Sequence, residues 1–145
     1  MFESPYCLKC GKCCINTEMI LLEEDVQRLK SLGLNLDAVA ERRGGFLRLK
    51  NVDGRCVFYD EANGHCRIYE HRPLGCRLYP LVFDEDRGVV LDEDCPLARE
   101  FAQRREELAK GILELERLLK GLERMYGYRV DWKKFRSSSA LLLKL

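Results

Sequence analysis

The chain has 145 residues, a net charge of +1, 46% hydrophobic residues and 34% charged residues, as expected for one ordinary soluble globular domain. The near-neutral charge gives no electrostatic indication of a nucleic-acid partner. The longest apolar runs, at 19–22 and 140–143, are far shorter than the ~20 residues that span a membrane. No secretory pattern precedes Cys7, so we expect a cytoplasmic protein with reduced thiols and no membrane partner.

Helices are predicted first along the chain. Residues 23–33 place apolar side chains at helical spacing, with acidic residues in the first turn and Gly33 at the end. Residues 35–45 predict a second short helix that ends at two glycines.

A hairpin region is predicted to follow, because the apolar period changes to two at residue 46. Turn sequences NVDG and EANG separate three predicted strands, at 46–50, 55–59 and 65–69. A loop or single helical turn is then predicted at 70–80, and a final hairpin at 81–91.

One long helix is predicted from Pro96 to about residue 125, with Cys95 at its N-cap. The tail predicts one strand at 128–132 and a loose apolar end. Together these elements predict an α+β fold, small and cysteine-rich, with short antiparallel hairpins and a long C-terminal helix. We expect a metal-binding region at 1–96 and a helical extension at 97–145 packed on it as a single domain.

Eight cysteines are many for a reducing compartment, and there they favour metal ligation over a disulfide framework. Four of them lie in the sequence CLKCGKCC, as Cys7, Cys10, Cys13 and Cys14. Adjacent Cα atoms are ~3.8 Å apart, whereas an unstrained disulfide needs about 4.4–6.8 Å, so Cys13 and Cys14 should not bridge each other. The C-x₂-C-x₂-C spacing is typical of iron–sulfur loops, and C-x₂-C also occurs in zinc knuckles.

The other four cysteines come from a predicted hairpin, a loop and a helix start: Cys56, Cys66, Cys76 and Cys95. Side chains diverge on an extended backbone, so Cys13 and Cys14 are predicted to face two different metal centres. One division gives the first centre Cys7, Cys10, Cys13 and Cys95. It gives the second centre Cys14, Cys56, Cys66 and Cys76. Cys95 precedes a proline, as does the last ligand of the ferredoxin run, but other divisions satisfy the same spacing.

Cations near the cysteines are expected to offset the negative charge of the thiolates. Arg72 precedes Cys76 by four residues and Arg77 follows it directly, so both are predicted to contact the metal cofactor by donating to sulfur. Three further cations lie close to cysteines in the sequence: Lys9, Lys12 and Arg67. His65 and His71 are alternative ligands, although the supply of cysteine favours a surface position for both.

Two motifs together resemble the CxxCxxCC cysteine-cluster family, also called YkgJ-type. CLKCGKCC matches the first family motif, and CRIYEHRPLGCR contains the cysteine, tyrosine, Arg-Pro and Cys-Arg elements of the second. Cys56 matches a cysteine that usually precedes the second motif. The resemblance covers about residues 1–96. It implies a zinc- or iron-chelating domain, in a family whose members are described as containing iron–sulfur clusters.

These observations favour an iron–sulfur protein with one or two [4Fe–4S] clusters. It would serve in electron transfer, in cluster delivery or as a redox-enzyme module, with a protein redox partner. The alternative is a zinc protein whose Cys₄ sites hold the fold and whose surface binds a partner. An enzyme is less favoured, because no catalytic base, nucleophile pair, phosphate loop or βαβ pattern is evident. The sequence leaves enzymatic activity open and indicates no oligomeric state.

Overall fold

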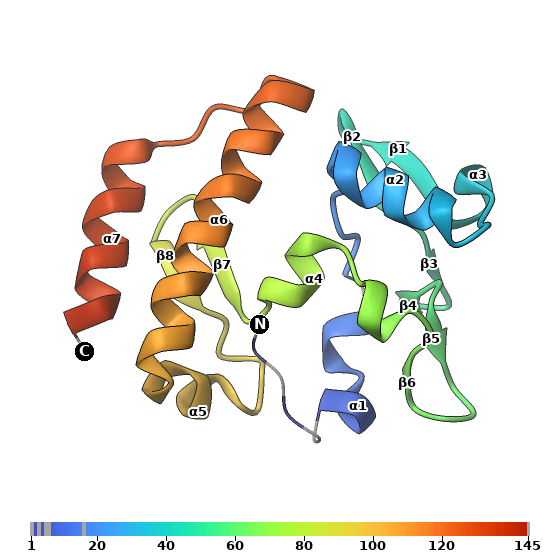
Figure 1. Ribbon diagram of the computed structural model, residues 1–145, viewed down its shortest axis with the longest axis horizontal. Coiled ribbons are helices and arrows are strands. Elements are labelled where there is room, and N and C mark those ends of the chain that lie inside the picture. Colours follow the sequence, from blue (N-terminus) through green and yellow to red (C-terminus); the bar gives the residue numbers. More distant parts are fainter. Residues whose placement is uncertain (1, 3, 5–6, 16, 145) are drawn as a thin grey trace. The chain divides into compact units, whose positions relative to one another are not determined.

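The computed structural model describes residues 2, 4, 7–15 and 17–144, without the side chains of residues 8 and 9. It divides into two compact units, which Figure 1 shows in the colours of the sequence. We call Glu3–Arg77 the N-terminal unit, and Met1–Phe2 with Leu78–Leu145 the C-terminal unit. Helices and short antiparallel strand pairs occur in both units, which confirms the predicted α+β fold class.

The N-terminal unit consists of short elements joined by tight turns (Figure 1). Its helices and 3₁₀ turns are α1 (Cys7–Cys10), η1 (Lys12–Cys14), α2 (Glu23–Ser31), α3 (Leu36–Val39), η2 (Tyr69–His71) and α4 (Leu74–Leu78), of which the last crosses the unit boundary. Its strands are β1 (Ala40–Arg43), β2 (Phe46–Leu49), β3 (Asn51–Val52), β4 (Arg55–Cys56), β5 (Tyr59–Asp60) and β6 (His65–Cys66).

These strands form three separate antiparallel hairpins, β1–β2, β3–β4 and β5–β6. Cys56 pairs with Asn51 in the second hairpin, and Cys66 pairs with Tyr59 in the third. The predicted strands at 55–59 and 65–69 are therefore present but shorter, because the chain turns directly after each cysteine. Both cysteines lie on hairpin strands, but the prediction that they share one hairpin is wrong: the strand of Cys56 pairs with β3, and the strand of Cys66 pairs with β5.

The predicted helix at 35–45 is wrong beyond Val39. Asn35 does begin a helix, and its side chain accepts a hydrogen bond from the Asp37 amide at 3.1 Å. Residues 40–43 instead pair with 46–49 across a turn at Gly44 and Gly45, which both have positive φ. Two consecutive glycines in this conformation connect antiparallel strands well, so the turn favours a hairpin over a helix end.

Helix α2 brings the N-terminal unit together around one apolar core. Val26 and Leu29 of this helix are buried, as predicted from their spacing. The core that contains them is completed by residues of the loops and hairpins: Cys14, Leu21, Val39, Ala40, Leu49, Cys56 and Phe58. Two of the predicted ligand cysteines are thus part of the apolar core, which limits their access to water.

The C-terminal unit packs one hairpin against helices (Figure 1). Its elements are β7 (Leu81–Asp84), β8 (Gly88–Leu91), α5 (Ala98–Gln103), α6 (Arg105–Tyr126) and α7 (Trp132–Lys144). Helix α6 contacts β7 and α7, and α7 also covers β8, where Ser138 Oγ accepts from the Val89 amide at 2.8 Å. The buried side chains of α6 recur at helical spacing, and no described helix is long and apolar enough to cross a membrane.

Three expectations for the C-terminal unit are wrong. The single long helix predicted from Pro96 to about residue 125 is divided at Arg104 into α5 and α6. Cys95 is not an N-cap, because residues 92–95 form a turn in which the Cys95 amide donates to the Asp92 carbonyl at 3.2 Å, and α5 begins only at Ala98. Residues 128–131 form no strand, and α7 begins at Trp132, where a loose end was expected. There the Asp131 carboxylate accepts from the Lys134 amide at 3.0 Å, which stabilises a helix N-terminus.

The turn of the cysteine loop depends on Gly11. This residue has φ of 65°, and its carbonyl accepts from the Cys14 amide at 3.1 Å. A Cβ atom at Gly11 would lie 2.6 Å from Cε2 of Tyr59. Arg55 covers the same ring, with its guanidinium carbon 4.5 Å from the ring centroid. The ring therefore has little room to move away.

Gly11→Ala is expected to destabilise the protein more than Gly44→Ala does. Both glycines have positive φ, but a Cβ at Gly44 meets nothing within 4 Å. We expect Gly44→Ala to cost about 1–2 kcal/mol from backbone conformation alone. The collision with Tyr59 should add about 1–3 kcal/mol to Gly11→Ala. Urea unfolding followed by circular dichroism measures both values, and equal losses would show that Tyr59 yields without cost.

Candidate metal centre

Five cysteines of the N-terminal unit lie close enough for their charges to interact. They come from η1, β4, β6 and α4: Cys13, Cys14, Cys56, Cys66 and Cys76. We call these five residues the thiol cluster. Among the described residues, no disulfide joins any of the chain's cysteines. The fold thus gathers thiols that are up to 63 positions apart in sequence, from Cys13 to Cys76.

The thiol of Cys14 is hydrogen-bonded to those of Cys13 and Cys66. The hydrogen bond from Cys14 lowers the pKa of Cys13 to about 7 and also lowers the pKa of Cys66, because an S–H donor stabilises a thiolate acceptor. The same two hydrogen bonds raise the pKa of Cys14. The protonated thiol of Cys14 thus donates to Cys13 and Cys66, which both ionise more easily as a result.

The remaining two thiols are held in the neutral form by burial. Burial raises the pKa of Cys56 to about 11 and raises the pKa of Cys76 well above its ordinary value. Interaction with other cysteines of the cluster raises both values further. Such a cluster costs free energy when its sulfurs ionise without a compensating cation. A bound metal would supply that charge.

The structure changes one premise about the adjacent cysteines. Residues Lys12–Cys14 form a 3₁₀ turn rather than an extended strand, so the side chains of Cys13 and Cys14 need not diverge. Both thiols lie in the same cluster and contact each other. The Thr17 hydroxyl supports this turn by donating to the Cys13 carbonyl. The expected assignment of Cys13 and Cys14 to two centres therefore loses its geometric basis.

The other predicted ligands are Cys7, Cys10 and Cys95. Cys7 and Cys10 begin and end α1, which packs against β6 and its Cys66. Cys95 belongs to the C-terminal unit, where its charge raises the pKa of Tyr79, after the larger effects of burial and of the Asp92 carboxylate. The Tyr79 hydroxyl donates to Asp92 at 2.8 Å. A role for these three cysteines as ligands stays a prediction.

Arg72 places a buried positive charge beside the thiol cluster. The residue is only 7% exposed, and its charge favours the thiolate forms of Cys13, Cys66 and Cys76. Its Nε donates to the Tyr69 carbonyl at 2.8 Å, and its guanidinium lies over the Tyr69 ring, 3.9 Å from the centroid. These contacts fix a cation where thiolates would need one.

The second predicted arginine, Arg77, is half-buried on α4, directly after Cys76. Within the part of the chain that the structure describes, its Nε is buried without a hydrogen-bond partner. A buried N–H of this kind is costly unless a further acceptor satisfies it. The structure does not place Arg77 against a particular sulfur, so its role as a donor to the metal site stays a prediction.

The remaining cations and imidazoles are more exposed. Lys12, Arg67 and His71 lie at the surface, as does much of the loop around them. The side chain of Lys9 lies outside the described residues. His65 is half-buried, and among the described residues its Nδ1 has no hydrogen-bond partner.

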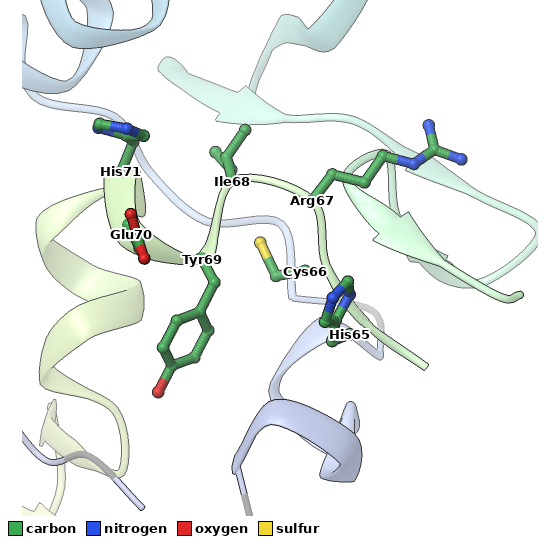
Figure 2. A pocket seen from close by; sticks show the side chains of 7 residues that line it. All are labelled: His65, Cys66, Arg67, Ile68, Tyr69, Glu70 and His71. Atoms are coloured by element: carbon green, nitrogen blue, oxygen red, sulfur yellow. The ribbon is translucent and has the colours of Figure 1, made fainter. Parts of the chain in front are cut away.

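A pocket of about 280 Å³ opens along the segment from His65 to His71. Figure 2 shows that Cys66 lies in the middle of its lining, between the side chains of Tyr69 and His65. The imidazole of His71 and the carboxylate of Glu70 lie at the far end of the same segment (Figure 2). Cys66 is therefore a member of the thiol cluster that borders a solvent-accessible hollow.

Sequence reasoning missed Asp25. This carboxylate is 1% exposed in the N-terminal unit and accepts three hydrogen bonds, from Leu22, Arg28 and Leu74. Burial raises its pKa, against the lowering effect of the Leu22 and Leu74 amides and of the Arg28 charge. The only signal in the sequence was an acidic first turn of the helix. The helix dipole explains such a turn without burial.

The cysteine thiols suit a soft metal, but they are not arranged as ligands around a common point. Within the described residues, no three His, Cys, Asp or Glu side chains are grouped tightly enough to hold a metal ion. The five sulfurs of the thiol cluster interact through hydrogen bonds and charge instead. Thiolate sulfur selects zinc and iron–sulfur clusters over hard cations. Chemically, the residues present therefore fit a thiolate-bound metal, and loading requires them to close around it.

Comparison with known proteins agrees with this chemistry. Residues 6–96 match the family described as "CxxCxxCC: Putative zinc- or iron-chelating domain". Uncharacterized protein MJ0661 of Methanocaldococcus jannaschii is 36% identical over 81 residues, which are 52% of this chain and 43% of that protein. The chain thus matches less than half the length of this relative. No solved structure matches the chain.

Cys13 is expected to alkylate near neutral pH in the reduced, metal-free chain. Its thiol has a pKa of about 7, so the thiolate fraction, and with it the rate, should rise through pH 7. An ordinary cysteine ionises near pH 8.5. Iodoacetamide labelling at several pH values, read by peptide mass spectrometry, measures the midpoint. Cys56, with a pKa of about 11, serves as the internal control and should stay unlabelled at pH 7.

Proposed function

Because the chain belongs to the CxxCxxCC family of zinc- or iron-chelating domains, we propose that its N-terminal unit holds a [4Fe–4S] cluster. The cluster would serve electron transfer, cluster delivery or a redox enzyme of which this chain is a module. The observation that carries the proposal is the gathering of five thiols beside one buried arginine. A [4Fe–4S] cluster and a structural zinc ion each take four cysteine ligands, so the five thiols are enough for either, and the choice between them rests on the spacing of the first loop.

The spacing of the first loop supports iron over zinc. Cys7, Cys10 and Cys13 follow the C-x₂-C-x₂-C run of iron–sulfur loops, and two of them lie on the helix that packs against Cys66. A zinc ribbon would instead favour two separate knuckles. Only the first loop of this chain has that spacing.

Buried charge supports a thiolate-bound centre of either kind. Four thiolates around a cluster leave a net negative charge, which is costly in an apolar core unless a cation lies nearby. Arg72 supplies such a cation at the thiol cluster. Arg77, with its unsatisfied Nε in the described part of the chain, is a further donor that a cluster sulfur could satisfy.

Zinc bound by four cysteines is the second candidate. The observation that favours it is the direct contact of Cys14 with both Cys13 and Cys66, because sulfurs around one small ion lie close together. In that case the N-terminal unit would be a structural module with a partner-binding surface.

The proposed setting is a reducing compartment, such as the cytoplasm. Its support is the match to a zinc- or iron-chelating family, because thiol ligands must be reduced to bind a metal. A protein redox partner is part of the proposal for an electron-transfer role. Cys66 borders the pocket of Figure 2, and that side of the unit is the proposed approach to the centre.

Metal and sulfide analysis tests the proposed function. The chain is purified without oxygen, and iron, zinc and acid-labile sulfide are measured per chain. We expect iron and sulfide in equal amounts, near four of each per cluster, with a brown colour that bleaches in air. Zinc without sulfide would replace this proposal with the structural alternative, and a chain without either metal would contradict both.

Arg72→Met is expected to lower the reduction potential of the bound cluster. The buried guanidinium stabilises the more negative, reduced state, so its removal should shift the potential downward by roughly tens of millivolts. Redox titration of the reconstituted full chain measures the shift. Arg67→Met is the matched control, because Arg67 is an exposed arginine of the same segment. An equal shift in both variants would mean that Arg72 has no special position near the centre.

A further inference from the structure

We propose that Asp25 is a positioning residue that holds the segment 72–76 in place for metal binding. This inference rests on the proposed metal-binding function. The segment carries Arg72 at one end and Cys76 at the other. The hydrogen bonds of Asp25 reach the backbone between these two residues, at Leu74.

The contact that carries the proposal joins α2 to α4. Asp25 Oδ1 accepts from the Leu74 amide at 3.0 Å, across 49 positions of sequence. Leu74 is itself 2% exposed and begins α4, so its amide has no earlier turn of helix to bond to. A buried carboxylate therefore fixes the start of the short helix that presents Cys76.

Arg28 gives the same segment a second attachment. Its Nη1 donates to Asp25 Oδ1 at 3.1 Å and to the Arg72 carbonyl at 3.3 Å. Asp25 and Arg28 together thus hold the backbone at residues 72 and 74. The intervening Pro73 is fully buried and has a fixed φ, so little freedom is left in this stretch.

Asp25 is more than a cap of its own helix. Its Oδ2 does accept from the Leu22 amide at 2.9 Å, which satisfies the N-terminus of α2. A cap needs only this oxygen and is commonly exposed, whereas Asp25 is 1% exposed and uses its second oxygen for Leu74 and Arg28. The burial is explained by the long-range attachment and not by the cap.

The position of the segment matters for the thiol cluster. Arg72 lowers the pKa of Cys13 and Cys66, and Cys76 interacts with Cys56, Cys13 and Cys66. A shift of residues 72–76 would move the cation and one thiol together. Substitution of a residue that orients a metal ligand from outside typically costs roughly 10–100-fold in metal affinity. Asp25 would act in this way through the backbone amide of Leu74, two residues before Cys76.

The experiment measures metal release from the full chain. Wild type, Asp25→Asn, Arg28→Met and Val26→Ala are purified without oxygen, and metal per chain is determined first. Each is then mixed with excess of a chromophoric chelator that reports both iron and zinc. We expect Asp25→Asn to release metal about tenfold faster than wild type or more. Arg28→Met should shift the rate in the same direction by a smaller factor.

Val26→Ala is the matched control for a merely structural role. Val26 adjoins Asp25 on α2 and is buried in the apolar core, and no hydrogen bond links it to residues 72–76. It should lower the urea midpoint of the metal-free chain while leaving the release rate within about twofold of wild type. Release from Val26→Ala as fast as from Asp25→Asn would overturn the inference, since any loss of stability would then suffice.

Each of the other outcomes also decides whether the inference holds. An unchanged release rate in a folded Asp25→Asn chain overturns the inference and leaves the proposed function intact. If Asp25→Asn does not fold, Arg28→Met decides in its place, and an unchanged rate in that variant overturns the inference. A wild-type chain that holds no metal overturns the proposed function itself, and the inference with it.

Discussion

The charge of the buried Arg72 beside a group of buried and half-buried thiols is the interaction on which the N-terminal unit depends. Thiolates repel one another, and an apolar core makes that repulsion stronger than water would. Cys14 and Cys56 are core residues, so little solvent is available to stabilise their thiolates. A guanidinium fixed by Tyr69 counters this repulsion. It lets several ionisable sulfurs share a small volume before any metal arrives.

Asp25 is a second buried charge, and its partners differ from those of Arg72. Asp25 is bound by backbone amides and by Arg28, whereas Arg72 faces sulfurs and an aromatic ring. Arg28 links the two, because one of its nitrogens contacts both Asp25 and the Arg72 carbonyl. Neither buried charge is therefore isolated, and the unit avoids the large penalty of an unpaired ion in its core.

Local sequence patterns predicted part of this fold well. The apolar spacing of α2, the turn at EANG and the hairpin at 81–91 follow from period and turn chemistry, whereas the pairing of the Cys56 strand with β3 was not predicted. The prediction of a helix at 35–45 was wrong because two consecutive glycines are compatible with a helix end and with a hairpin turn. Only the pairing of β1 with β2 decides between these outcomes. The prediction of a strand at 128–132 was wrong for a similar reason. Asp131 caps a helix, and this local contact outweighs the strand-like sequence before it.

For the site, sequence predicted residue types better than their arrangement. The second motif indicated an arginine near the cysteines, and the structure places Arg72 there. The adjacent cysteines were expected to diverge, but Gly11 and its positive φ produce a tight 3₁₀ turn. Asp25 was not identified because its partner, Leu74, is 49 positions away and contributes only a backbone amide. No pattern of side chains can reveal such a contact.

None of the described strands belongs to a sheet of more than two strands. The N-terminal unit can therefore open in small parts. Each hairpin there is closed by a few ladder hydrogen bonds, and Cys56 and Cys66 sit on different hairpins. Small cooperative segments of this kind open one at a time, at a fraction of the global unfolding free energy. Amide hydrogen exchange would then proceed hairpin by hairpin. Opening of the β5–β6 hairpin would expose the sulfur of Cys66, whereas exposure of Cys56 also opens the apolar core to which it belongs.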